Sequence, residues 1–156
     1  MLASISRMVR DDPNKNSPFL LSLKESVERI YEELRNRKLN IDELIDRLGG
    51  ITNDITTKEK AERDIGGKEI YAIYERIRNV LSRDMDVNEG EVKELARQIW
   101  DDIKDRLVGN WKEATEIKRE VKNSIRLEVI GILNSYKPAI INEITDEVFD
   151  AIISIR

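Results

Sequence analysis

Three basic side chains recur at four-residue intervals in the second half of the chain: Lys118, Lys122 and Arg126. In a helix this spacing places them on one face, where they form a basic ridge. Such a ridge can contact the phosphates of a nucleic acid. Glutamates stand between the basic residues, so the other interpretation is a solvated helix face with i,i+4 pairs. The spacing favours the solvated face and leaves DNA-backbone binding as an alternative function.

Carboxylate pairs also occur at helical spacing, such as Asp42/Asp46 and Asp101/Asp105. General acid–base catalysis needs a cleft and a matched partner in addition to two carboxylates, and the sequence indicates neither. The chain contains no cysteine and no histidine. This composition excludes disulfides, Cys/His zinc sites, thiol nucleophiles and His-based triads. We therefore predict that the chain is not itself an enzyme and holds no cofactor and no metal.

Two short motifs are similar to ligand-binding loops but lack residues that those loops require. Gly66-Gly67-Lys68 ends like a phosphate loop, yet Glu62 stands where that motif has its first glycine. Asp84-Met-Asp86-Val-Asn88 begins like a calcium loop, yet its sixth position holds Glu89 instead of glycine. We interpret the first motif as a break between two helices and the second as a helix-capping loop.

The composition is typical of one soluble helical domain. Of the 156 residues 37% are charged and 5% are aromatic, which favours helices packed through aliphatic side chains. The 27 basic and 31 acidic residues give a net charge of −4, unlike a dedicated nucleic-acid-binding domain. No apolar run approaches the about 18 residues that span a membrane, and the first residues lack the apolar core of a signal peptide. We predict a cytoplasmic location and no membrane contact.

Apolar residues recur at steps of three and four, and no segment alternates with period two. This pattern predicts an all-α fold, a single irregular bundle of about six helices. Helix starts are indicated by Ser17-Pro18, Asn40, Asn88 and Pro138, and Gly66-Gly67 indicates a break. The expected helices lie at about 18–37, 40–48, 67–81, 88–107, 109–137 and 138–152.

The apolar spacing also predicts which side chains of these helices are buried. Tyr31 falls on the buried face expected for the first helix, and Ile41 and Ile45 fall on that of the second. Gly49-Gly50 is expected to end the second helix or to kink it. Residues 1–17 have mixed polarity and are predicted to be a flexible arm or linker.

Trp111 stands in a polar loop before the longest amphipathic stretch. It either fills one end of the bundle or anchors a binding partner, since tryptophan is enriched at interface hot spots. The sequence favours a core position.

The order of short motifs resembles the C-terminal helical domain of the restriction (R) subunit of type I restriction-modification enzymes. The resemblance covers residues 18–156. It is carried by Ile41–Ile45, Ile65–Tyr74, Glu94–Ala96 with Asn110-Trp111, Val121–Leu133 and Tyr136–Pro138.

The resemblance implies a non-catalytic helical assembly domain over residues 18–156. The full R subunit of that family cleaves DNA and translocates it with ATP and Mg²⁺, through a nuclease domain and two motor domains. The chain carries no P-loop, no acidic helicase box and no nuclease core. The implied partners are the methyltransferase and specificity subunits and the motor domains of the same polypeptide. Trp111, Arg126 and Tyr136 match the family pattern and are the implied partner-binding candidates.

Overall fold

The computed structural model describes residues 2–11, 17–82 and 87–155, and these residues form helices and turns without a strand. The all-α prediction is confirmed, and the expected six helices are close in number to the seven α-helices that are described. Two short 3₁₀ helices, η1 and η2, accompany them. The bounds are α1 (Leu2–Asp11), α2 (Pro18–Arg35), α3 (Ile41–Ile65), α4 (Lys68–Leu81), α5 (Glu89–Ile103), η1 (Lys104–Arg106), η2 (Trp111–Glu113), α6 (Thr115–Ile132) and α7 (Pro138–Ser154).

Three of the predicted helix starts are confirmed by capping bonds, and the fourth by Pro138 in the first turn of α7. The Ser17 Oγ accepts a hydrogen bond from the Leu20 backbone N–H at 3.1 Å. The side-chain oxygens of Asn40 and Asn88 accept in the same way at the starts of α3 and α5. Each cap satisfies one backbone donor that the first turn of a helix leaves without a partner. Asp84 and Asp86 of the rejected calcium motif lie outside the described residues.

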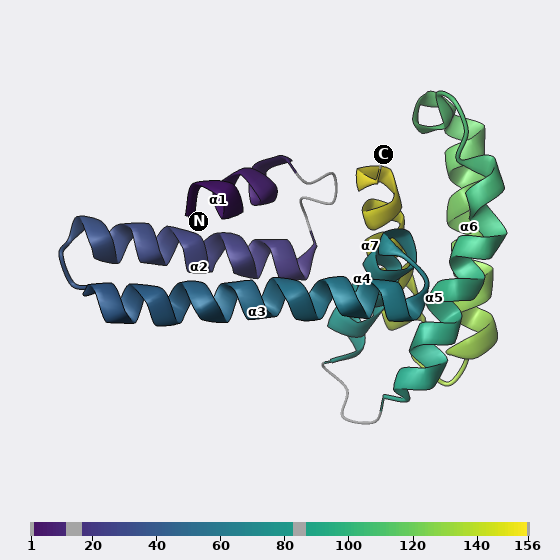
Figure 1. Cartoon of the computed structure of the whole chain (residues 1–156). Coiled ribbons are helices and arrows are strands. Elements are labelled where there is room, and N and C mark those ends of the chain that lie inside the picture. Colours follow the sequence, from purple (N-terminus) through teal and green to yellow (C-terminus); the bar gives the residue numbers. More distant parts are fainter. Residues whose placement is uncertain (1, 12–16, 83–86, 156) are drawn as a thin grey trace.

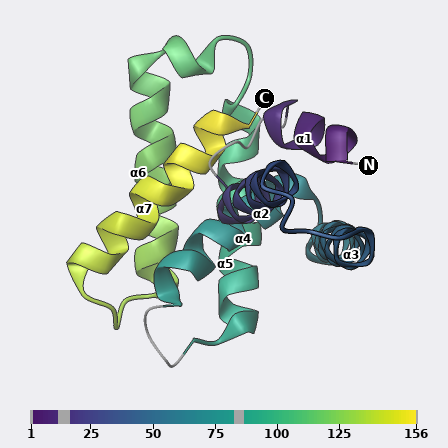
Figure 2. The same ribbon diagram turned by 90° about the vertical axis from the view of Figure 1, so that its left-hand side faces the viewer.

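The helices form two regions that differ in shape (Figure 1). Helices α4–α7 pack together around one apolar cluster, and we call this region the body. Helices α2 and α3 run side by side away from the body, with α1 lying on α2, and we call these three helices the extension. Figure 2 looks along α2 and α3 and shows the body behind them. A single bundle is therefore not confirmed, because the buried apolar residues form two clusters.

The first residues differ from the predicted flexible arm. Residues 2–11 form α1, and Ile5 of that helix is buried in the cluster of the extension. Leu2, Ile5, Met8 and Val9 recur at helical spacing, and this was the signal for a helix that packs on α2. Residues 12–16 of the predicted linker lie outside the described residues.

Of the two outcomes expected at Gly49-Gly50, a helix end is wrong. Helix α3 continues through Gly49-Gly50 to Ile65, where Gly66 and Gly67 take φ angles of 120° and 133°. Only glycine adopts these angles without strain, so the predicted break at this pair is confirmed. The predicted buried positions Ile41, Ile45 and Tyr31 are wrong: their exposed fractions are 75%, 60% and 41%.

One buried arginine joins the first and last helices of the body. The Arg76 Nη1 on α4 lies 2.9 Å from the Glu147 carboxylate and 3.0 Å from the Asp150 carboxylate, both on α7. The side chain of Arg76 is 4% exposed, while the two carboxylates are about half exposed. These two ion pairs connect α4 to α7, although the Nε and Nη2 of Arg76 have no hydrogen-bond partner.

Candidate functional site

Trp111 lies in η2, just before α6, and its side chain is buried in the core of the body with 6% exposed. The neighbouring Lys112 Nζ donates to the Ile155 carbonyl at 2.7 Å and lies 5.9 Å from the centroid of the indole ring. These contacts connect the start of α6 to the end of α7. The core position that the sequence favoured is confirmed, and a role of Trp111 in partner binding stays a prediction.

Tyr136 lies in the turn between α6 and α7 and is half-buried against the same core. Trp111 precedes α6, Tyr136 follows it, and Arg126 lies within it. A helix of 18 residues is about 27 Å long, so the two aromatic residues stand at opposite ends of α6. The structure therefore does not bring Trp111, Arg126 and Tyr136 into one site.

The basic ridge follows α6 as expected, but its three side chains differ in their surroundings. The Lys122 Nζ lies 2.9 Å from the Asp146 carboxylate of α7 and 5.7 Å from the centroid of the Phe149 ring. Lys118 is half-buried, and Arg126 is exposed with no ion pair among the described residues. Only part of the ridge is therefore an uncompensated positive charge.

Arg126 borders a shallow polar groove of about 310 Å³ between α6 and α7. The groove is lined by amides, a hydroxyl, two cations and one carboxylate: Asn123, Asn142, Thr145, Lys122, Arg126 and Asp146. A guanidinium with no ion pair beside two amides can hold a carboxylate or a phosphate oxygen.

Two apolar residues on the solvent side of α6 were not singled out by the sequence. Leu127 is 69% exposed and Ile130 is 38% exposed. They lie three residues apart, next to Arg126, and off the buried stripe of Val121, Ile125 and Val129. Their position off the buried stripe is the sequence feature that could have identified these two side chains as exposed. An arginine beside exposed apolar side chains is a composition found in protein interfaces.

The extension exposes a second set of large apolar side chains, namely Leu21, Tyr31, Ile41 and Ile45. None of the first ten residues of α3 is buried, because the body does not reach this end of the helix. Exposed large apolar side chains of this kind are available for binding.

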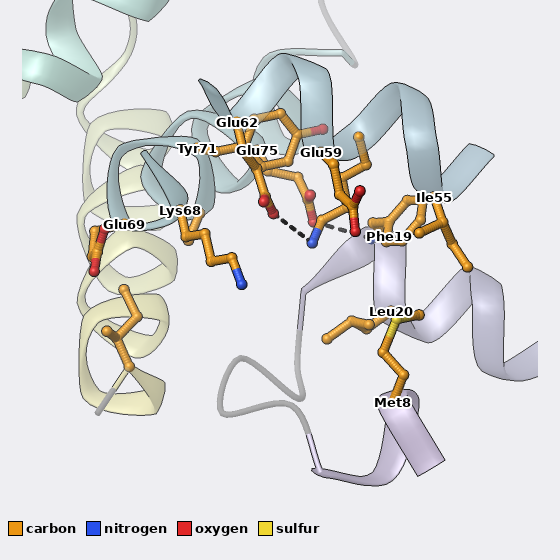
Figure 3. A pocket seen from close by; sticks show the side chains of 13 residues that line it. Met8, Phe19, Leu20, Ile55, Glu59, Glu62, Lys68, Glu69, Tyr71 and Glu75 are labelled. Atoms are coloured by element: carbon orange, nitrogen blue, oxygen red, sulfur yellow. Dashed lines mark hydrogen bonds and ion pairs between the residues drawn. The ribbon is translucent and has the colours of Figure 1, made fainter. Parts of the chain in front are cut away.

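The extension meets the body at a cavity of about 270 Å³, where Met8 and Leu20 face carboxylates of α3 and α4 (Figure 3). The Phe19 backbone N–H at the start of α2 donates to the Glu75 Oε1 of α4 at 3.0 Å. Burial raises the pKa of Glu75, and the hydrogen bond from Phe19 and the charge of Lys58 offset part of this rise. Lys58 pairs with Glu62 at 2.7 Å and lies 5.1 Å from the centroid of the Phe19 ring.

These contacts form a structural joint between the extension and the body. Every cation and carboxylate named at the joint already has a partner inside the chain. The Arg97 Nε of α5 also donates to the Ile65 carbonyl at 3.1 Å and holds the end of α3 on the body.

Residues 2–11, 17–82 and 87–155 contain no group of three or more acidic side chains placed to hold a metal ion. None of the helices within these ranges is long and apolar enough to cross a membrane.

Comparison with known families gives a match to one family model, described as Type I restriction enzyme HindI endonuclease subunit-like, C-terminal. The match covers residues 2–154, nearly the whole chain, and it includes α1. Searches of curated proteins and of solved structures gave no match. The chain thus belongs to the family of C-terminal domains of type I restriction enzyme HindI endonuclease subunit-like proteins.

Proposed function

We propose that this chain is a non-catalytic assembly domain of a cytoplasmic type I restriction enzyme R subunit. In this role it docks onto the methyltransferase–specificity complex and packs on the motor domains of its own polypeptide. ATP and Mg²⁺, which the full-length family uses, bind outside this chain. The observation that carries the proposal is the family match over residues 2–154.

Two separate exposed apolar surfaces support a domain with two partners. One lies on α6, around Arg126, Leu127 and Ile130, and the other lies on the extension. When a partner covers an exposed leucine or isoleucine, the complex is stabilised by about 25 cal/mol for each Å² of apolar surface removed from water. We assign the α6 surface to the motor domains and the extension to the methyltransferase–specificity complex.

Size-exclusion chromatography tests the proposal directly. The chain is mixed with the cognate methyltransferase–specificity complex at physiological salt, without DNA. We expect the two to elute together. A chain that elutes separately at concentrations well above micromolar contradicts docking by this domain alone.

The α6 surface is tested with the isolated motor domains as a second probe. Arg126→Glu and Leu127→Glu should weaken their binding to the chain, because they place a carboxylate where a guanidinium and an apolar side chain are exposed. The same two variants should elute with the methyltransferase–specificity complex like the wild type.

DNA-backbone binding through Lys118, Lys122 and Arg126 is the second candidate. The observation that favours it is Arg126, which is exposed and has no ion pair among the described residues. The bond between Lys122 and Asp146 weighs against it, because that carboxylate repels phosphates. If this candidate holds, the chain retards a DNA duplex at low salt, and the affinity falls steeply as salt rises. Unchanged DNA mobility at low salt excludes it.

A further inference from the structure

One face of α3 forms an uncharged stripe. Ile41, Ile45, Gly49, Thr52 and Thr56 follow one another at steps of four, four, three and four, which places them on one side of the helix. All five residues are exposed, and Ile41 and Ile45 are the most exposed isoleucines of the described residues. We call this face the α3 stripe. It is about 22 Å long at 1.5 Å per residue.

The two threonines add little polar surface to the stripe. The Thr52 Oγ1 donates to the Leu48 carbonyl at 2.9 Å, and the Thr56 Oγ1 donates to the Thr52 carbonyl at 3.0 Å. Bonds of this kind turn the hydroxyl back to the helix. The face that a partner meets is therefore mainly methyl groups.

Gly49 lies in the middle of the stripe, and no contact inside the chain requires a glycine at this position. A Cβ at this position would meet no atom within 4 Å, and its backbone is helical, so neither space nor conformation requires glycine. Glycine in a helix interior disfavours the helix. Its effect at this position is a flat surface where another backbone can approach closely.

One edge of the stripe carries negative charge. Asp42 and Asp46 follow Ile41 and Ile45 by one residue each and lie on the same side of them, about 100° around the helix. Both are exposed, and neither has an ion pair with any described residue. Arg47, the nearest cation of α3, pairs with Glu33 of α2 and lies on the opposite side of the helix.

We propose that the α3 stripe is the docking face for one helix of the methyltransferase–specificity complex. The partner is an amphipathic helix with an apolar stripe bordered by lysine or arginine. The steps of four match ridges-into-grooves helix packing, and the basic border of the partner faces Asp42 and Asp46. This inference rests on the proposed function and names its surface.

The first test is the double variant Ile41→Glu/Ile45→Glu, with binding to the immobilised methyltransferase–specificity complex as the measurement. We expect the dissociation constant to rise at least about tenfold. The control is Leu127→Glu/Ile130→Glu, which adds the same two charges at exposed apolar residues on α6 and should bind like the wild type. Circular dichroism should show unchanged helix content in both variants.

The second test addresses the acidic edge. Asp42→Lys/Asp46→Lys should weaken binding at least about tenfold at low salt, and the loss should shrink as salt screens the charges. Glu116→Lys/Glu120→Lys changes two exposed glutamates of α6 at the same i,i+4 spacing and should leave binding unchanged.

The outcomes separate this inference from the proposed function. If the wild type binds the complex and both α3 variants bind as tightly, the α3 stripe is not the docking face, and the assembly function stands. If the wild type does not bind, both are overturned. If sedimentation shows a dimer of the wild-type chain and a monomer of Ile41→Glu/Ile45→Glu, the stripe holds a second copy, and the partner-helix inference is overturned.

Discussion

The body and the extension use apolar side chains in opposite ways. Among the described residues, the core of the body contains 18 buried side chains, several with no exposed surface, whereas that of the extension contains six. Four of the seven large apolar side chains found exposed lie on the extension. The body thus buries a larger share of its large apolar side chains, and the extension leaves a larger share of them exposed.

The largest expected difference between the two regions concerns core truncation. Ile99→Ala in the body should lower the free energy of unfolding by about 4 kcal/mol, because the fully buried site cannot collapse around the lost atoms. Ile51→Ala in the extension should lower it by about 2 kcal/mol, since α3 is packed on one side only. Urea unfolding measures both, and equal losses would contradict the comparison.

Two glycine substitutions should have effects of opposite sign. Gly49→Ala should raise the free energy of unfolding by up to about 1 kcal/mol, because the added methyl group meets nothing and alanine favours the helix. Gly66→Ala should lower it by about 1 kcal/mol, because its φ is +120° and the Cβ lies 3.2 Å from the Ile70 Cδ1. Thermal unfolding of the two variants checks the signs, and stabilisation by Gly66→Ala would be inconsistent with a break at this residue.

The joint between the regions should depend on pH through Glu75. Burial raises the pKa of this carboxyl above its ordinary value of 4.5, so the folded chain holds the proton more tightly than the unfolded chain does. The stabilisation that the protonated Glu75 contributes is complete below pH 4.5, and it is lost as the pH rises through the raised pKa of this carboxyl. Compared with Glu75→Gln, the wild type should therefore lose stability over this interval. If the free energies of unfolding of the wild type and of Glu75→Gln change in parallel with pH, Glu75 does not make the joint pH-dependent.

The smallest effect is expected at the ion pair on the surface of the body. The side chains of Lys122 and Asp146 are 49% and 64% exposed, so solvent screens their interaction. Lys122→Ala should change the free energy of unfolding by less than about 0.5 kcal/mol. A loss above about 1 kcal/mol would show that the contact of Lys122 with Phe149 contributes more than its charge.

Local signals in the sequence predicted four helix starts. Ser17, Asn40, Asn88 and Pro138 each act within a few residues of their own position, and the structure uses each at a helix start. The all-α class followed from the same local periodicity. The continuous α3 shows the limit of such rules, because a glycine pair weakens a helix without having to end it.

Exposure could not be predicted in the same way. Periodicity identifies which residues share a face, and it does not show whether another helix covers that face. Ile41 and Ile45 share the spacing of a core stripe, and yet the body lies too far along α3 to cover them. Trp111 and Tyr136 were partner-binding candidates because they match the family pattern, and such a pattern does not show that the length of α6 separates them.

The joint at one end of α3 also has a mechanical consequence. The 25 residues of α3 form a rod about 37 Å long, held on the body at Ile65 and free of it at Ile41. By simple trigonometry on that length, a turn of about 10° at the joint would carry the far end through about 6 Å. A small change in packing around Gly66-Gly67 would therefore be magnified at the tip of α3, as at the far end of a lever.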